Sequence, residues 1–203
     1  LASLEPENLI GAHGPPFSGQ LEIKKIIINY RDTLQFLWDQ TVRCANKGLT
    51  LNETINVIKL PRQFSEHYTT QQLYGLVEHH VRQIYTGLFG WFDEDEANLF
   101  PVPLPERSQR LVEGFGGKAR VREIIDASLT KNDFRWAIEL SSWLVRGNLN
   151  DLGIADAGEL EDRNRLASAL RGVAYTTSAA NIRNWCITRA LELDETLNLS
   201  RFR

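Results

Sequence analysis

Apolar residues recur every three or four positions through most of the chain, which is the spacing of an α-helix with one apolar face. The longest such stretch predicts a helix from about 20 to 46, and Gly48 follows it as an expected C-cap. Thr50 and Glu53 form the pattern of a capping box, which predicts the start of a short second helix. The apolar spacing then predicts a further helix from about 70 to 89.

The C-terminal half is predicted to consist of helix pairs joined by tight turns. Segments of about 118–129 and 133–146 form the first pair, and segments of about 157–174 and 177–195 form the second. The stretch from Asp133 to Leu140 resembles the second helix of a tetratricopeptide hairpin. Apolar and polar residues do not alternate over more than a few positions. The sequence therefore predicts an all-α fold, a helical bundle with tetratricopeptide-like helical hairpins in its C-terminal half.

Glycine, proline and acidic residues suggest where the chain divides. Residues 1–19 are rich in glycine and proline and are interpreted as the end of another domain. Residues 20–203 are interpreted as one helical domain, with an N-terminal lobe at 20–104 and a helical-hairpin lobe at 105–203. The boundary between the lobes follows an acidic and proline-rich stretch without helical spacing.

Composition excludes several classes of protein. The 203 residues carry 23 Lys+Arg and 26 Asp+Glu, and the net charge of -3 argues against a polybasic nucleic-acid binder. No strictly apolar run is longer than three residues, the length of Ile26–Ile28, so no membrane span is predicted. Cys44 and Cys186 are too few for a disulfide framework and are expected to be buried thiols. The start of the chain lacks a signal-peptide pattern, and the lack of any methionine predicts either a fragment or a sequence from which modified residues were omitted.

The chain does not contain the sequence of a complete catalytic site. Gly116-Gly117-Lys118 lacks the earlier glycine and the following Ser or Thr of a phosphate-binding loop, so it is interpreted as the end of a helix. The patterns Gly-x-Ser-x-Gly and His-Glu-x-x-His are also missing from the sequence.

Two histidine positions carry the candidate chemistry. His13 follows a short apolar run and enters a loop of Gly14, Pro15 and Pro16, an arrangement that can present an imidazole to a metal. An ordinary loop histidine has the same spacing. His79 and His80 are adjacent on a predicted helix, so their side chains diverge by about 100° and cannot bind one ion together. One of them can face a partner, and the alternative for His79 is a surface or core histidine.

Aromatic residues gather around the helix predicted at 70–89, with Tyr74 inside it and Trp91 and Phe92 after it. Packing in a core or an interface is the first interpretation. The functional alternative is an apolar wall for an alkyl chain, where each buried CH₂ contributes about 0.8 kcal/mol. These three residues are therefore the candidates for substrate binding, and both interpretations can hold together.

The order of several motifs resembles the alkyl sulfatases of the metallo-β-lactamase superfamily, in the region of their central helical dimerisation domain. The resemblance covers nearly the whole chain. It is carried by Ala12-His13-Gly14-Pro15-Pro16, Asn29-Tyr30-Arg31-Asp32, Asp39–Thr50, Tyr74–His80, Gly90-Trp91-Phe92-Asp93, Asp133–Ala137 and Ile182-Arg183-Asn184.

This resemblance implies a protein of three parts: a zinc hydrolase domain, a helical middle and a sterol-carrier-like domain. Residues 1–19 would be the end of the metallo-β-lactamase-like part, and residues 20–203 would be the dimerisation domain that joins two copies into a homodimer. The helix at 20–46 is the candidate for part of that surface, and its alternative role is packing within the chain. Members of the family are often periplasmic or secreted, but these residues give no address, so the compartment stays unknown.

The resemblance also implies roles for single residues. His13 matches the last histidine of the zinc ligand set, whose other members would lie upstream, so zinc would bind in the longer protein and not to this chain alone. His79 matches a histidine that faces the sulfate group. The substrate would be an alkyl sulfate ester, cleaved to an alcohol and sulfate, with chain length and point of attack left open. Gly14 and Pro15 stand where many relatives carry His and Trp, so a preference for primary alkyl chains is not implied.

Two other functions remain open at this point. The helical hairpins alone would suit a repeat module that binds a partner protein, in which case 118–195 would carry an open groove and the helix at 20–46 would be peripheral. The loop around His13 alone would suit a fragment of another metallo-β-lactamase-fold hydrolase.

Overall fold

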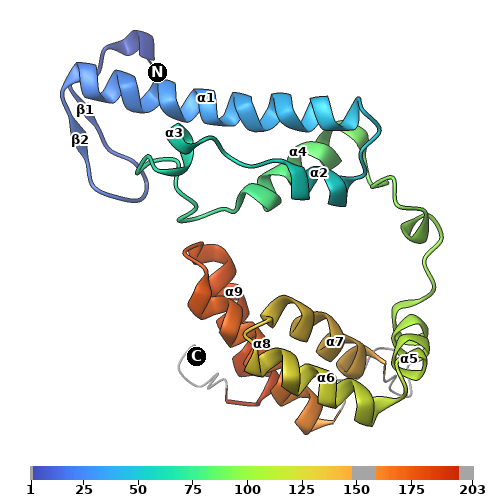
Figure 1. The fold of residues 1–203 in the computed structure, drawn as a ribbon. Coiled ribbons are helices and arrows are strands. Elements are labelled where there is room, and N and C mark those ends of the chain that lie inside the picture. Colours follow the sequence, from blue (N-terminus) through green and yellow to red (C-terminus); the bar gives the residue numbers. More distant parts are fainter. Residues whose placement is uncertain (1, 148–158, 197–203) are drawn as a thin grey trace. The chain divides into compact units, whose positions relative to one another are not determined.

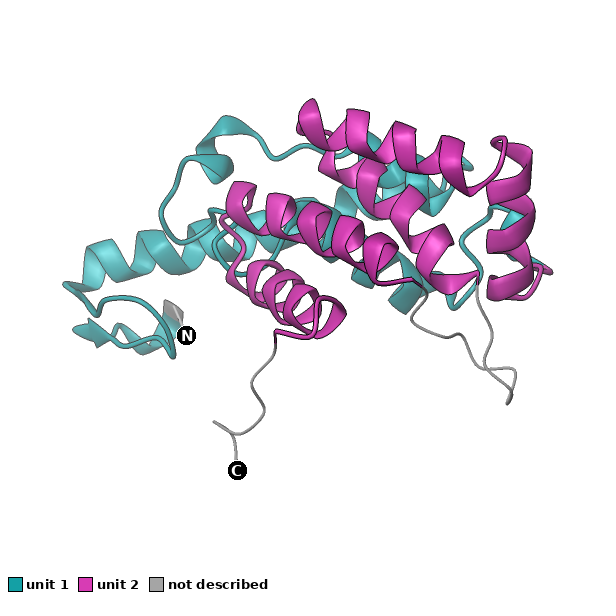
Figure 2. Ribbon diagram, turned by 90° about the horizontal axis from the view of Figure 1, so that it is seen from below, with its two compact units in different colours: residues 1–99 teal, residues 100–203 magenta. Residues whose placement is uncertain are grey.

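A computed structural model describes residues 2–147 and 159–196. The chain forms two compact units, Leu1–Leu99 and Phe100–Arg203, which are coloured separately in Figure 2. In the part of the chain that the structure describes, strands occur only as two residue pairs, and the rest of the regular structure is helical. The predicted all-α class is therefore confirmed. Within the same residues, no helix is both long enough and apolar enough to cross a membrane.

The first unit begins with a β-hairpin that the sequence did not predict. A single 3₁₀ turn, η1 (Ala2–Leu4), precedes β1 (Asn8–Leu9), which pairs antiparallel with β2 (Phe17–Ser18). The Ser18 hydroxyl donates a hydrogen bond of 2.8 Å to the Asn8 side chain and ties the strands together. Gly19 then takes a positive φ of 96° and turns the chain into the first helix.

The long helix α1 (Gln20–Ala45) confirms the prediction for 20–46 and crosses the top of the first unit in Figure 1. One face is buried and packs on two shorter helices, α2 (Leu51–Val57) and α4 (Val77–Phe89). The shared core consists of Leu37, Cys44, Leu51, Ile55, Ile58, Val81 and Tyr85. Gly48 has a positive φ of 77° in the turn after α1, as expected of a helix-ending glycine.

The capping box that opens α2 is also confirmed. The Thr50 side chain accepts a hydrogen bond of 3.2 Å from the Glu53 backbone amide, and the Glu53 carboxylate accepts one of 2.8 Å from the Thr50 amide. A four-residue helix, α3 (Arg62–Ser65), follows and was not predicted.

The prediction of a helix from about 70 was wrong in its start, because α4 begins only at Val77. Residues before it form turns, in which the His67 carbonyl accepts hydrogen bonds from the amides of Thr70 and Gln71. The Gln72 side chain then accepts a hydrogen bond of 2.8 Å from the Val77 amide and satisfies a donor in the first turn of α4. Local hydrogen bonds thus replace the helix that the apolar spacing favoured.

The second unit follows a segment with a single 3₁₀ turn, η2 (Glu96–Asn98), and starts with α5 (Leu104–Gly114). Gly116 and Gly117 both have positive φ values, 98° and 89°, and the Gly117 amide donates back to the Val112 carbonyl. This geometry confirms that a helix ends at Gly116-Gly117, and Lys118 begins the next one.

The predicted helix pairs are α6 (Lys118–Thr130) with α7 (Phe134–Arg146), and α8 (Leu160–Thr176) with α9 (Ala180–Leu193). Each helix packs on the next, so the second unit is a stack of helical hairpins (Figure 1). Residues 157 and 158 of the predicted third helix lie outside the described residues. Cys44 and Cys186 are both buried and free, as predicted.

Ion pairs fasten the two helical hairpins to each other. Arg122 on α6 donates hydrogen bonds of 2.7 and 2.8 Å to both carboxylate oxygens of Asp162 on α8, which is fully buried. Arg165 on α8 donates in the opposite direction, with bonds of 2.9 and 3.0 Å to Asp126 on α6. Such forked pairs fix both distance and orientation, so they set the register of α8 on α6.

Candidate functional site

The loop of the β-hairpin carries His13 and brings it against Tyr74. The two rings lie with their centroids 4.6 Å apart at an interplanar angle of 27°, which is a stacked arrangement. The two residues are 61 positions apart in the sequence, and both were singled out from it as site candidates. His13 is exposed, and one face of its imidazole is covered by the tyrosine ring.

Two further aromatic residues, which were not among the site candidates, support this loop. Phe17 on β2 meets Tyr68 edge to face, with ring centroids 6.3 Å apart. The Tyr68 hydroxyl lies 3.3 Å from the place where a Cβ on Gly14 would stand, and Gly14 has a positive φ of 90°. Gly14 therefore has two reasons to lack a side chain, the backbone conformation and the approach of the tyrosine. In the sequence, only the presence of Gly14 beside His13 indicated that another side chain could approach the backbone here.

Residues 67–70, which precede α4, form a turn held by local hydrogen bonds. In its first half, Nδ1 of His67 accepts a hydrogen bond of 3.3 Å from the Thr69 amide and lies 2.9 Å from the Thr69 hydroxyl. The Thr70 hydroxyl donates 2.5 Å to the Phe64 carbonyl, which ties the turn to α3. His67 thus serves the backbone of this turn.

His79 lies in the first turn of α4, five residues after Tyr74. Its Nε2 is 3.5 Å from a carboxylate oxygen of Glu78, and the ring is partly exposed. His80 lies beside it on the helix, with its ring against Gly75. His80 is exposed as a whole residue, and the partial desolvation of its ring, together with the neighbouring His79, lowers the pKa of His80. The neutral imidazole is therefore favoured for His80, and His79 is the residue with an acidic neighbour.

The structure does not bring Trp91 and Phe92 next to Tyr74. They follow α4 at its C-terminal end, about 20 Å along the helix axis from its start at 1.5 Å per residue. Their rings contact each other with centroids 5.5 Å apart, and Trp91 is 75% exposed. Their role as an alkyl-binding wall stays a prediction, and within one chain they lie at a different end of α4 from the two histidines.

His13 can supply a single nitrogen ligand to a metal, and zinc sites in proteins use three or four protein ligands. Among residues 2–147 and 159–196, no group of three or more His, Cys, Asp or Glu side chains is placed to hold an ion. The exposed and stacked imidazole suits one position of a zinc site. The rest of such a site would have to come from outside the described part of this chain.

A second surface feature runs along α1. The helix carries an apolar stripe, defined as Tyr30, Leu34, Trp38 and Val42, at intervals of four residues beside its buried face. Tyr30, Leu34 and Trp38 keep 52%, 48% and 46% of their surface exposed. Large apolar residues that recur on one exposed helix face usually mark a contact with another protein.

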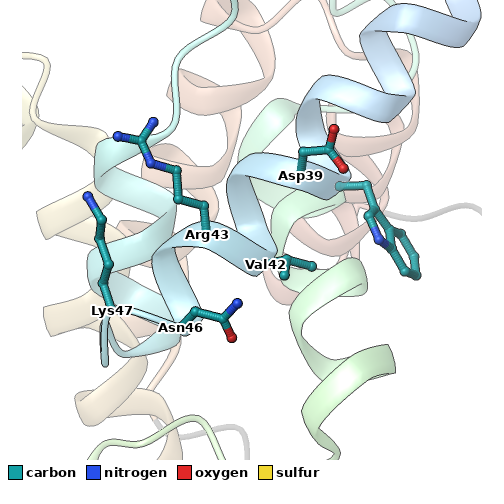
Figure 3. A pocket seen from close by; sticks show the side chains of 6 residues that line it. Asp39, Val42, Arg43, Asn46 and Lys47 are labelled. Carbon is teal, nitrogen blue, oxygen red and sulfur yellow. The ribbon is translucent and has the colours of Figure 1, made fainter.

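The end of this stripe forms a shallow hollow of about 460 Å³ (Figure 3). Its lining residues, Trp38, Asp39, Val42, Arg43, Asn46 and Lys47, all belong to α1 or to the turn after it. In Figure 3 the Arg43 and Lys47 side chains point away from Val42, so these two basic groups do not converge on the apolar side. Because a single helix and its turn supply all these residues, the hollow is an exposed helix face and not an enclosed ligand pocket.

The second unit has a smaller hollow of about 320 Å³ between α6 and the start of α7. Arg120, Glu123, Lys131 and Asp133 supply charges of both signs to its rim, and Trp136 supplies an apolar wall. Arg120 is already paired with Glu123 at 2.8 Å. This mixed and partly neutralised lining gives little support to a dedicated peptide groove.

Comparisons with known proteins agree with one another. Residues 50–196 match the family model described as alkyl sulfatase dimerisation. The chain is 34% identical over 96% of its length to a linear primary-alkylsulfatase of Pseudomonas sp. (strain ATCC 19151), and it spans 35% of that protein. It is 31% identical over 91% of its length to an alkyl/aryl-sulfatase of Saccharomyces cerevisiae, of which it spans 27%.

A solved structure is similar over almost the whole chain. The stereoselective inverting sec-alkylsulfatase of Pseudomonas sp. superimposes with a TM-score of 0.83 and 30% identity, over 95% of this chain and 29% of that one. The chain thus spans about a third or less of the relatives that it matches. The family model covers 147 of the 203 residues, from 50 to 196. The chain therefore belongs to the alkyl sulfatase dimerisation family.

Proposed function

We propose that this chain is the helical dimerisation domain of a zinc-dependent alkyl sulfatase. Such an enzyme adds water to an alkyl sulfate ester and releases an alcohol and sulfate. The observation that carries the proposal is the likeness to proteins named as alkylsulfatases along nearly the whole chain. Within this proposal the chain has two tasks: it joins two copies and it lends side chains to the reaction site.

The stripe on α1 supports the first task. Tyr30, Leu34 and Trp38 are exposed at intervals of four residues, and the partly buried Val42 continues the stripe. A second copy of the chain would cover it, because a two-fold axis lets the same stripe meet itself. Within one copy Arg31 pairs with Asp32, and the Asp39 carboxylate accepts a hydrogen bond from Gln35. Arg31 and Asp39 stand eight residues apart on α1, so an antiparallel crossing centred between them would also bring each near the opposite charge of the partner copy.

The loop around His13 supports the second task. Its imidazole would occupy one ligand position of the zinc site, with Tyr74 covering the ring face. Zinc bound there would lower the pKa of a coordinated water towards neutrality and so supply the nucleophile. The other ligands would come from parts of the protein that correspond to the remaining two thirds of the relatives.

His79 would act on the sulfate group. A protonated imidazole offers a positive charge to the ester and a proton to the departing oxygen, whether the S–O or the C–O bond of the ester breaks. Glu78, 3.5 Å from Nε2, would then form an ion pair with the protonated ring between turnovers. Trp91 and Phe92 would supply apolar surface for the alkyl chain.

The test is a chimera in which this chain replaces the matching segment of the Pseudomonas linear primary-alkylsulfatase. Release of sulfate from dodecyl sulfate is measured with zinc present, and folding is checked by circular dichroism. We expect activity that His13→Ala abolishes and that His79→Ala lowers by about 10²–10⁴-fold, the usual contribution of a general acid. His67→Ala serves as the matched histidine control and should stay within a few-fold of the parent chimera. Full activity of the His13→Ala chimera would contradict the proposal, as would zinc-dependent sulfate release by the 203-residue chain alone.

A further inference from the structure

We propose that His80 is a positioning residue: its ring, packed over Gly75, sets the bend that holds Tyr74 against His13. The inference rests on the proposed function in one respect, which is that His13 serves as a zinc ligand. The contacts of His80 with Gly75 and of Tyr74 with His13 lie within this chain and can be tested without zinc or substrate.

One hydrogen bond lies on each side of the bend, and neither involves Tyr74 or Gly75. On one side the Leu73 amide donates 2.8 Å to the Gln71 carbonyl, and on the other the Val77 amide donates 2.8 Å to the Gln72 side chain. Tyr74 and Gly75 lie between these bonds. Something besides these two bonds must therefore fix the direction in which the Tyr74 ring leaves the backbone.

Contact between His80 and Gly75 supplies that restraint. A Cβ on Gly75 would stand 2.5 Å from Nε2 and 2.7 Å from Cε1 of His80, distances that real Cβ atoms do not reach. The imidazole therefore occupies the space of the missing side chain. The φ of Gly75 is not in the left-handed region, so a Cβ at this position would disturb the His80 ring and not the backbone conformation. The ring is the end of an exposed side chain and would have to turn away from Gly75.

The backbone of His80 is fixed by α4. Its backbone amide donates 3.0 Å to the Leu76 carbonyl, so the ring is carried by the first turn of a regular helix. His80 on α4 contacts Gly75, which is the residue after Tyr74. The Tyr74 ring in turn stacks on the His13 ring. An outer group that orients a metal-binding histidine lowers the cost of bringing it to the metal.

The experiment follows the Cε1–Hε1 resonance of His13 by two-dimensional NMR in the 203-residue chain, with Tyr74→Leu as the reference for an unstacked ring. We expect Gly75→Ala and His80→Ala to move the His13 resonance most of the way to its position in the reference. His80→Phe keeps a planar ring over Gly75 and should leave the His13 resonance near that of the parent chain. The control is Gly87→Ala, a glycine on α4 with open space around its Cβ position, which should leave the resonance unchanged.

Each outcome decides the inference. Circular dichroism first confirms that a variant keeps its helices, and His80→Phe provides a second route if Gly75→Ala does not fold. An unchanged His13 resonance in both Gly75→Ala and His80→Ala would overturn the positioning role, and so would a Tyr74→Leu reference that equals the parent chain. Loss of stacking in His80→Phe would show that the ring packing is not what holds Tyr74. None of these results depends on sulfatase activity, so the proposed function can fail while the positioning role stands.

Discussion

The pair formed by Arg122 and Asp162 allows a quantitative test of how the helical hairpins are joined. Asp162 is fully buried, and both its oxygens accept hydrogen bonds from Arg122, at 2.7 and 2.8 Å. The bond to Asp162, with the smaller contribution of Glu159, raises the pKa of Arg122. Arg122→Met would leave a buried carboxylate whose next cation, Arg165, is 3.9 Å away.

Breaking a buried ion pair from one side costs about 3–5 kcal/mol of unfolding free energy. The Arg122 side chain is 21% exposed and a second cation is near, so we place the cost at the lower end, about 3 kcal/mol. The double variant Arg122→Met with Asp162→Leu removes both charges and should recover more than half of that loss. Arg120→Met is the matched control on α6, because its pair with Glu123 is exposed on both sides and contributes below about 0.5 kcal/mol.

Urea unfolding at one protein concentration, followed by tryptophan fluorescence and circular dichroism, measures these differences. Trp136 and Trp143 report on the same unit, since they form an aromatic cluster with Phe115. The reasoning fails if Arg122→Met costs less than about 1 kcal/mol. It also fails if the double variant is no more stable than the single one.

Three further changes test local features of the fold. Gly172→Ala should destabilise the chain relative to Gly87→Ala by about 1–3 kcal/mol, because a Cβ on Gly172 would overlap the Phe134 ring whereas Gly87 has open space; equal melting temperatures would contradict this. Because the pKa of His80 is lowered in the folded chain, the unfolded chain takes up this proton first, and the unfolding free energy should fall as pH drops below about 6.5. His80→Gln should flatten this part of the pH profile measured by urea unfolding. Identical profiles for the parent chain and the variant would refute this prediction. Thr50→Ala removes half of the capping box and should lower the unfolding free energy by about 0.5–2 kcal/mol in thermal melts, with Thr50→Asn as the capping control; no loss in the alanine variant would exclude a stabilising cap.

Features with local causes were predictable from the sequence. The helix at 20–46, the capping box at Thr50 and the helix end at Gly116-Gly117 all depend on residues within a few positions of one another. The start of α4 was not predictable, since the Gln72 side chain and the turn at His67 compete with helix formation there. Apolar spacing contains no information about which side chain will satisfy a backbone donor.

The candidate site was predictable only as separate residues. His13 and Tyr74 could be chosen from the resemblance and from the gathering of aromatic residues, but their stacking joins two segments 61 positions apart. The contacts of Tyr68 with the loop and of His80 with Gly75 could not be predicted, because each joins residues whose approach depends on how the turns before α4 fold. The exposed stripe on α1 likewise could not be separated from its buried face, since both are apolar and only the packing partners distinguish them.

The central claim is that these helices join two copies of the chain through the stripe on α1. Sedimentation equilibrium at micromolar concentration tests it most directly, with the chain mass of 23.2 kDa as the unit. We expect the parent chain to have about twice this mass, and Leu34→Glu with Trp38→Glu to have the mass of one chain while keeping its circular dichroism spectrum. Lys25→Glu, a charge change on the opposite side of α1, should leave the mass of the pair unchanged. A single-chain mass for the parent protein, or an unaltered dimer in the doubly substituted stripe, would contradict the account.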